Sequence, residues 1–442
     1  MTSAKILLLN LHSSSNAGDA ALTAVTIHQL KQHFPECCLT LAMDDPGSHS
    51  GEGRPVQSLN GWVRKTGTDG KSKWRFSRLL WLIPGSIFPI LTYRLFGRGF
   101  YRLTPPGLRG LMQAYIQSDL AVSVPGGFLY SSGSGLTLLI ALFTLWLARL
   151  AGKPFYIFPQ SIGPFRRRWE RRAVRRVLSL ARVLMVREPV SLQELKACGI
   201  SHPRTYLLPD MAFSYQGVPR KTAEEWLTSH GIDPSRDRPL LGMTLMNWGE
   251  QNPQFRLQSE YEDACASAAR FFIQQYGGKV LLFSQVWGPF SSQDDRVPAR
   301  RAAAKLPDLS ASIRVVEDPL PPDLLISLFG LMDVFIGTRM HSNIFALSQG
   351  VPAIAIGYQH KTRGIAEMAG IAPWVIDIRT IDAPALIEKL KSLWTEREAV
   401  RKRLQQTVPA LIRQASRPGS IAAEDYCTFL VRAPHAQAHT RS

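Results

Sequence analysis

The chain alternates short apolar runs with polar turns and amphipathic segments. Apolar runs at Lys5 to Asn10 and Cys38 to Met43 enclose a segment from Ala20 to His33 whose apolar residues have helical spacing. Three more apolar runs, each ending in a polar turn, follow at 119–124, 154–158 and 182–186. This order predicts parallel strands joined by helices that cover both faces of a sheet.

The same pattern begins again after a segment rich in proline, glycine and charge, from Gln216 to Pro239. Strand-like runs recur at 240–245, 279–284, 313–316, 334–336 and 353–356. A chain of 442 residues is also too long for one ordinary hydrophobic core. We therefore expect an α/β protein with two Rossmann-like domains of parallel strands that face a cleft.

The expected N-terminal domain covers residues 1–215, with a variable lid at 44–105, and the expected C-terminal domain covers 236–415. Within the lid, residues 44–73 are rich in glycine, serine and charge, which predicts a long loop. A helix at 416–433 is expected to pack back on the N-terminal domain, and 434–442 to form a disordered tail.

Two apolar segments raise the question of membrane insertion. Leu136 to Leu150 is shorter than the roughly 20 residues that span a bilayer, which favours a buried helix. Leu79 to Phe100 is longer, but Pro84, Gly85 and Pro89 interrupt it. We interpret this second segment as the wall of a cleft; a hairpin that touches the membrane is the alternative.

Charge and cysteine content narrow the class of protein. A net charge of +18 favours anionic partners, and 45% hydrophobic residues argue against disorder. The five cysteines lack metal-type spacing and are typical of reduced thiols, so we expect a cytoplasmic protein without a metal site.

Seven arginines lie between Arg166 and Arg176, in a predicted helix. They form either a solvated face or a surface that docks on anionic lipid at the inner face of the cytoplasmic membrane. Nucleic acid is not an expected partner, because no binding motif or aromatic platform accompanies the cluster.

The strongest chemical motif is Gly337-Thr338-Arg339-Met340-His341, between the strand at 334–336 and a predicted helix. Anionic ligands bind at such strand ends and helix starts. Arg339 can bind a carboxylate or phosphate with two hydrogen bonds, and His341 can act as a general acid or base. Lys361 follows the next strand and is expected to reach the same ligand, as is Ser342.

Other strand ends carry polar side chains or glycines that suit a bound sugar. Asp19 begins a helix, where it either caps the backbone or acts on a substrate hydroxyl. Glu188 is a second candidate base, and Arg187 is either its ion-pair partner or a cleft residue that binds the donor. The expected acceptor-binding residues are Asn16, Gly18, Gly126, Gly127, Gln160 and Ser161.

These motifs occur in the order seen in the polysaccharide pyruvyl transferase family, which the chain resembles over residues 5–370. The resemblance rests on Asn-x-Gly-Asp at 16–19, the Pro-Gly-Gly turn at 125–127 and Gln-Ser-Ile-Gly-Pro at 160–164. Arg-Glu-Pro-x-Ser at 187–191 and the block from Gly337 to Lys361 complete it. It implies a glycosyltransferase-B-like fold, with Arg339 and His341 at the pyruvate donor site.

The implied reaction transfers pyruvate from phosphoenolpyruvate to hydroxyls of a cell-surface glycan, or of its lipid-linked precursor, as a ketal. Phosphoenolpyruvate is then a co-substrate, and no cofactor is expected. The alternatives are a nucleotide-sugar glycosyltransferase of the same fold and a non-catalytic scaffold docked on a membrane.

Overall fold

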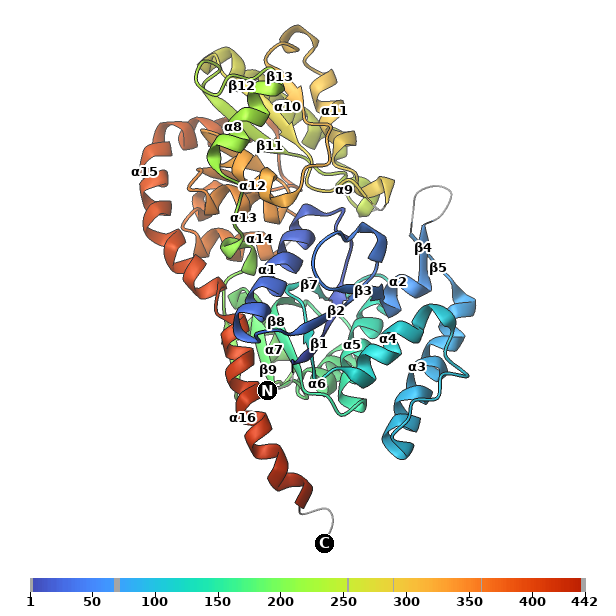
Figure 1. Ribbon diagram of the computed structural model, residues 1–442. Coiled ribbons are helices and arrows are strands. Elements are labelled where there is room, and N and C mark those ends of the chain that lie inside the picture. Colours follow the sequence, from blue (N-terminus) through green and yellow to red (C-terminus); the bar gives the residue numbers. More distant parts are fainter. Residues whose placement is uncertain (1–2, 67–71, 253, 289, 359, 439–442) are drawn as a thin grey trace.

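Two parallel sheets organise the chain in the computed structural model, which describes residues 3–66, 72–252, 254–288, 290–358 and 360–438 (Figure 1). The first sheet has the strand order β10-β9-β8-β6-β1-β2-β3, with β7 paired to β8. Its strands are β1 (Lys5–Leu11), β2 (Cys38–Met43), β3 (Arg54–Gln57), β6 (Leu120–Ser123), β7 (Gly126–Leu129), β8 (Phe155–Ile162), β9 (Val183–Val186) and β10 (Thr205–Leu207). Neither this sheet nor the second closes into a barrel.

The second sheet has the order β13-β12-β11-β14-β15-β16 and is parallel throughout. Its strands are β11 (Leu240–Thr244), β12 (Lys279–Phe283), β13 (Ile313–Val315), β14 (Val334–Gly337), β15 (Ala353–Gly357) and β16 (Val375–Asp377). The central strands β11 and β14 are buried along their whole length, as expected for a sheet covered on both faces.

Helices connect the strands and cover the sheets. In the N-terminal half these are α1 (Ala17–His33), α2 (Leu59–Val63), α3 (Phe76–Phe96), α4 (Pro106–Gln117), α5 (Leu136–Leu150), α6 (Arg168–Leu178) and α7 (Pro189–Ala197). The C-terminal half contains α8 (Arg220–Ser229), α9 (Trp248–Gln251), α10 (Gln258–Tyr276), α11 (Arg296–Ala304), α12 (Pro322–Phe329), α13 (Met340–Ser348), α14 (His360–Met368) and α15 (Ala383–Ala415).

The last helix, α16 (Pro418–Ala438), returns to the first sheet, where it contacts α1, β8 and β9. Asp425 on α16 is buried and accepts hydrogen bonds from Arg182 and from the Tyr156 hydroxyl, at 2.9 and 3.0 Å. The helix runs into the predicted tail, of which residues 439–442 lie outside the described part. The domain boundaries themselves stay a prediction.

The region expected to be a long loop and lid contains regular structure instead. Residues 54–57 add β3 to the edge of the first sheet, and β4 (Arg64–Thr66) pairs with β5 (Ser72–Trp74) in a separate hairpin. Residues 67–71 of the predicted loop lie outside the described residues. The segment expected to be interrupted by its prolines forms one helix, α3, with Pro84 and Pro89 inside it.

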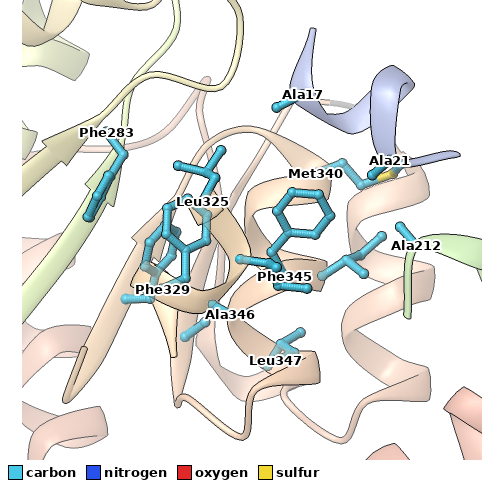
Figure 2. Close-up of a cluster of buried hydrophobic side chains, with 14 of the residues drawn as sticks. Ala17, Ala21, Ala212, Phe283, Leu325, Phe329, Met340, Phe345, Ala346 and Leu347 are labelled. Atoms are coloured by element: carbon cyan, nitrogen blue, oxygen red, sulfur yellow. The ribbon is translucent and has the colours of Figure 1, made fainter. Parts of the chain in front are cut away.

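Helix α1 joins the two halves, because it packs on α12 and its first turn approaches the first turn of α13. Figure 2 shows Ala17 and Ala21 of α1 close to Met340 of α13, and Phe345 on the buried side of the same helix. Ala17 and Ala21 are fully buried although they lie in the first turns of their helix. This contact brings the amino ends of the two helices together, where the candidate site forms.

Candidate functional site

The loop between β1 and α1 places an amide and a carboxylate at the amino end of α1. Asn16 is the N-cap, because its Oδ1 accepts a hydrogen bond from the Gly18 backbone at 3.0 Å. Its Nδ2 donates to Asp19 Oδ2, also at 3.0 Å. The predicted capping role of Asp19 is therefore wrong. Asn16 accepts the hydrogen bond from the free backbone N–H at the start of α1, and Asp19 lines a cavity instead.

Arg339 is held at the start of α13 by a buried carboxylate. Its Nε and Nη2 donate to Asp295 at 3.1 and 2.6 Å, and Asp295 is fully buried. Burial raises the pKa of Asp295 despite the neighbouring guanidinium. Burial alone would lower the pKa of Arg339, but Asp295 outweighs it and raises that pKa. The pair orients Arg339, and its guanidinium lines the same cavity as Asp19.

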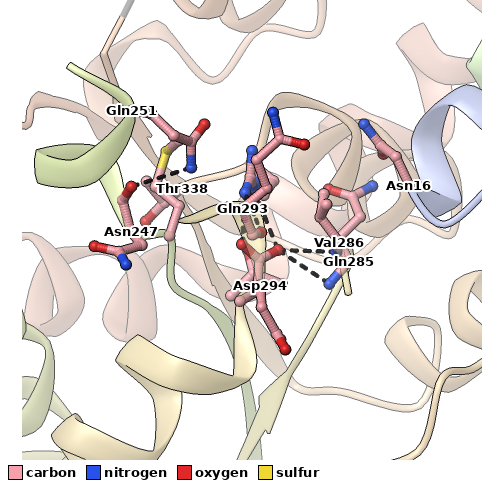
Figure 3. Close-up of polar contacts among 12 residues, drawn as sticks. Asn16, Asn247, Gln251, Gln285, Val286, Gln293, Asp294 and Thr338 are labelled. Carbon is pink, nitrogen blue, oxygen red and sulfur yellow. Dashed lines mark hydrogen bonds and ion pairs between the residues drawn. The ribbon is translucent and has the colours of Figure 1, made fainter. Parts of the chain in front are cut away.

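The loop after β12 connects this ion pair to the N-terminal half. Asp295 accepts hydrogen bonds from the backbone of Gln285 and Val286, at 3.2 and 3.0 Å. The Gln285 carbonyl accepts in turn from the Ala17 backbone at 2.9 Å. Figure 3 shows Asn16 beside Gln285 and Val286. Its dashed lines include the hydrogen bonds that the backbone N–H groups of Gln285 and Val286 donate to the Asp295 carboxylate. One loop therefore positions Arg339 and the start of α1 together.

His341 lies in the first turn of α13, close to a second buried carboxylate. Its Nε2 is 3.8 Å from Asp210 Oδ2, and its side chain is 13% exposed. Burial alone would raise the pKa of Asp210, but Arg187 and His341 lower it below its usual range. A Cβ on Gly18 would lie 2.1 Å from His341 Nδ1, so only glycine allows α1 to approach this ring.

Arg187 lies beneath the site in a buried polar cluster. It donates to Asp210 at 2.5 Å and to the Ser161 hydroxyl at 2.7 Å. Glu188 is fully buried, 3.5 Å from Arg187, and accepts hydrogen bonds from Ser161 and Ser191. Arg187 reaches the cavity, whereas Glu188 and Ser161 lie behind its wall, where they hold Arg187.

Gln160 is displaced from the cavity for a simple reason. The sequence predicts that its strand ends at Phe158, but β8 continues to Ile162 and is buried along its whole length. Gln160 is fully buried and donates to the Val124 carbonyl. Ser342 is likewise buried, 2.7 Å from the Thr244 hydroxyl, and donates to the Arg339 carbonyl at 2.6 Å. The structure gives both side chains internal partners and does not place them in the cavity.

His12 is a site residue that the sequence reasoning missed. Its Nδ1 is 3.0 Å from Asp44 Oδ2, in a pair whose side chains are 39% and 20% exposed. Burial opposes a charge on His12, but Asp44 and Asp19 outweigh it and raise its pKa to about 9. The imidazole is therefore a cation at neutral pH. His12 directly follows β1, and this place at the end of a parallel strand was the sequence signal that could have identified it.

These elements enclose a cavity of about 190 Å³ between the two halves of the chain. It is lined by His12, Asn16, Asp19, Gly126, Gly127, Arg187, Gln285, Arg339, Met340, His341 and Tyr358. Gln285, Met340 and Tyr358 were not expected. Lys361 belongs to α14, but its side chain lies outside the described part of the chain.

The charged groups that line the cavity are mostly cations. Two arginines and the His12 imidazolium meet a single lining carboxylate, Asp19, among the described residues. The other nearby carboxylates lie behind the lining cations: Asp44 pairs with His12, Asp295 pairs with Arg339, and Asp210 and Glu188 both pair with Arg187. Among the described residues, no three histidine, cysteine or acidic side chains are grouped so as to hold a metal ion. The arrangement can bind an acid group and move a proton beside it.

Comparison of the sequence with known proteins gives a family match and a relative. The profile of a family described as polysaccharide pyruvyl transferase matches residues 16–360. The chain is 25% identical over 413 residues to the amylovoran biosynthesis protein AmsJ of Erwinia amylovora, covering 91% of this chain and 95% of that protein.

Two solved structures show the fold. A UDP-glucosyltransferase from Polygonum tinctorium is 12% identical with a TM-score of 0.56, over 96% of this chain and 98% of that one. The UDP-GlcNAc 2-epimerase of Neisseria meningitidis, bound to UDP-GlcNAc, is 11% identical with a TM-score of 0.54, over 97% of this chain and 100% of that one. These similarities confirm the glycosyltransferase-B-like fold class.

Proposed function

The chain belongs to the polysaccharide pyruvyl transferase family, and from this premise we propose that it transfers pyruvate from phosphoenolpyruvate to a glycan. The product is a ketal on two hydroxyls of a cell-surface polysaccharide or of its lipid-linked precursor. One observation carries the proposal: a single cavity brings Arg339, Arg187, His341 and Asp19 together.

The cations of the cavity match the two acid groups of the donor. Phosphoenolpyruvate carries a carboxylate and a phosphate on one carbon, and each requires a positive partner. Arg339 is pre-oriented by Asp295 and Arg187 by Asp210, so neither side chain must be ordered when the donor binds. His12 adds a third positive charge.

The reaction begins with proton transfer to the donor. His341, as the imidazolium, protonates the methylene carbon, which becomes a methyl group and leaves an oxocarbenium-like centre at C2. The lowered pKa of Asp210 keeps that carboxylate ionised 3.8 Å from His341, where it stabilises the protonated ring. A sugar hydroxyl then attacks C2, and the phosphate leaves with the electrons of its C–O bond. A second hydroxyl attacks C2, transfers its proton to the now neutral His341 imidazole and closes the ketal.

Asp19 is the better candidate for the base that takes the hydroxyl proton. It lines the cavity, and among the described residues its one side-chain hydrogen bond is from Asn16. Glu188 is buried within the cluster around Arg187, which favours a positioning role for it. Gly126 and Gly127 form part of the wall where the sugar would lie.

The test is donor binding by the full chain. Phosphoenolpyruvate should raise the melting temperature, whereas UDP and GDP should not. Arg339→Gln should weaken binding at least about tenfold, because a charge-assisted bond to the donor is lost. The matched control is Arg296→Gln, which removes a surface partner of Asp294 outside the cavity. Stabilisation by UDP without any by phosphoenolpyruvate would instead indicate a nucleotide-sugar transferase.

A further inference from the structure

Helix α3 exposes a continuous strip of large apolar side chains. Phe76, Leu80 and Leu95 are 75%, 79% and 74% exposed, and Ile83 and Leu91 are also exposed. Their spacing places all five on one side of the helix, which is about 30 Å long. Contiguous apolar surface of this kind marks a site of interaction.

The opposite side of α3 is fixed to the protein. The helix packs on α2, α4 and α5, and Gly85 is so close to Pro105 that a Cβ there would lie 2.7 Å from its ring. Thr104 donates to the Gly85 carbonyl at 2.9 Å. Among the described residues, α3 is the one helix long and apolar enough to cross a bilayer, but 33% of that stretch is buried inside the protein. A partner can therefore cover one face of α3, whereas lipid cannot surround it.

The charged residues of the segment that carries the strip are all basic. Residues 72–118 contain seven lysines and arginines and no acidic residue. Arg94, Arg98 and Arg102 are exposed at or beyond the carboxyl end of α3. Between α3 and α4, a cavity of about 430 Å³ is lined by aromatic and basic side chains that include Trp62, Trp81, Arg78, Arg102 and Arg109. Arginines suit lipid phosphates, and tryptophans concentrate at the membrane interface.

We propose that this α3 surface, formed by the exposed face of α3 and the arginines around it, docks the protein on an anionic phospholipid bilayer. The helix lies in the plane of the interface, with its apolar strip at the acyl boundary and its arginines at the lipid phosphates. A second copy of the chain fits less well, because two uniformly basic surfaces repel each other. The inference does not depend on the reaction proposed above.

Two further sets of contacts support the placement of α3 at the membrane interface. Helix α5 contacts both α3 and α6, and α6 carries further exposed arginines. Helix α2, on which α3 packs, also reaches the candidate site, because Ser58 and Asn60 donate to Asp44, the partner of His12. A docked molecule would thus hold its cavity close to the bilayer, where a lipid-linked sugar is found.

The experiment is vesicle flotation with the purified full chain. Vesicles of phosphatidylcholine with about one third phosphatidylglycerol should carry the protein, and pure phosphatidylcholine should carry much less. The double variant Leu80→Gln, Leu95→Gln should lower the affinity at least about tenfold. The triple variant Arg94→Gln, Arg98→Gln, Arg102→Gln should weaken the preference for anionic lipid. Inorganic phosphate should not release the bound protein.

The control is Leu430→Gln, Val431→Gln on α16, whose wild-type side chains are 49% and 72% exposed, and it should float as wild type. Circular dichroism establishes that each variant is folded. Flotation unaffected by the leucine variant would overturn the proposal. So would a dimer in sedimentation velocity that this variant dissociates, because the strip would then be an interface between copies. Release by inorganic phosphate would assign the arginines to a soluble anion instead.

Discussion

At the residue scale, the cavity is built from charges held in pairs. Each cation that faces the ligand has a carboxylate behind it: Asp44 for His12, Asp210 for Arg187, Asp295 for Arg339. A pair of this kind keeps the cation charged and fixes its direction before the donor arrives. Because Asp44 raises the pKa of His12, the contribution of this pair to the stability of the fold depends on pH.

His12→Gln gives a prediction for stability against pH. The folded-state pKa of His12 is about 9, against 6.5 for an unperturbed histidine. A raised pKa means that the proton stabilises the fold fully below pH 6.5, and that this stabilisation disappears as pH rises through 9. The wild type should therefore exceed His12→Gln in free energy of unfolding near pH 6, and the gap should shrink between pH 6.5 and 9 and be lost above pH 9. Urea denaturation across this range measures it.

The control is Asp44→Asn, which removes the carboxylate that raises the pKa of His12. In that background, His12→Gln should change the free energy of unfolding by nearly the same amount at every pH. A constant gap between wild type and His12→Gln would show that the imidazole is not held as a cation.

The residues missed by the sequence reasoning share a physical cause. His12 gains its charge from Asp44, which lies 32 positions later, so no local pattern announces it. Gln160 and Ser161 were expected in the cleft because a polar pair after an apolar run resembles a strand end. The strand instead continues through them, since each finds an internal hydrogen-bond partner. Burial of a polar side chain against a partner from another strand is a tertiary property.

At the element scale, the site depends on the approach of α1 to α13. The sequence predicts both helices and the strands before them, and parallel connectivity brings their starts to the same edges. It does not predict that Asn16 rather than Asp19 caps α1, or that α3 remains one helix through two prolines. The first outcome is local, because the side chain of Asn16 bonds to Gly18 and Asp19. The second depends on packing against α2, α4 and α5.

Gly18→Ala tests the helix contact. The new Cβ would lie 2.1 Å from His341 Nδ1, so the ring or the helix must move. A displacement of about 1 Å at a catalytic group lowers turnover by about 100-fold, while the fold should persist. Initial-rate kinetics and circular dichroism measure the two effects. Gly47→Ala is the matched control, because a Cβ there meets open space and the activity should not change. Wild-type turnover in Gly18→Ala would remove His341 from its proposed place.

At the scale of the whole molecule, neither half of the chain contains the site alone. His12, Asn16, Asp19 and Arg187 come from the first half, and Arg339 and His341 from the second. The loop at Gln285 and the returning helix α16 connect the halves on two sides. The sequence motifs identify the pieces, but only their distribution over two facing sheets explains why they act on one ligand.

The most direct test of the account is product formation. Purified protein, phosphoenolpyruvate and the polysaccharide from a strain lacking this protein should release one phosphate for each pyruvylidene group found on the glycan by mass spectrometry. His341→Ala should lower this rate by at least about 100-fold, because a positioned general acid is lost. Phosphate release without a ketal, or an unchanged rate in His341→Ala, would contradict the assignment.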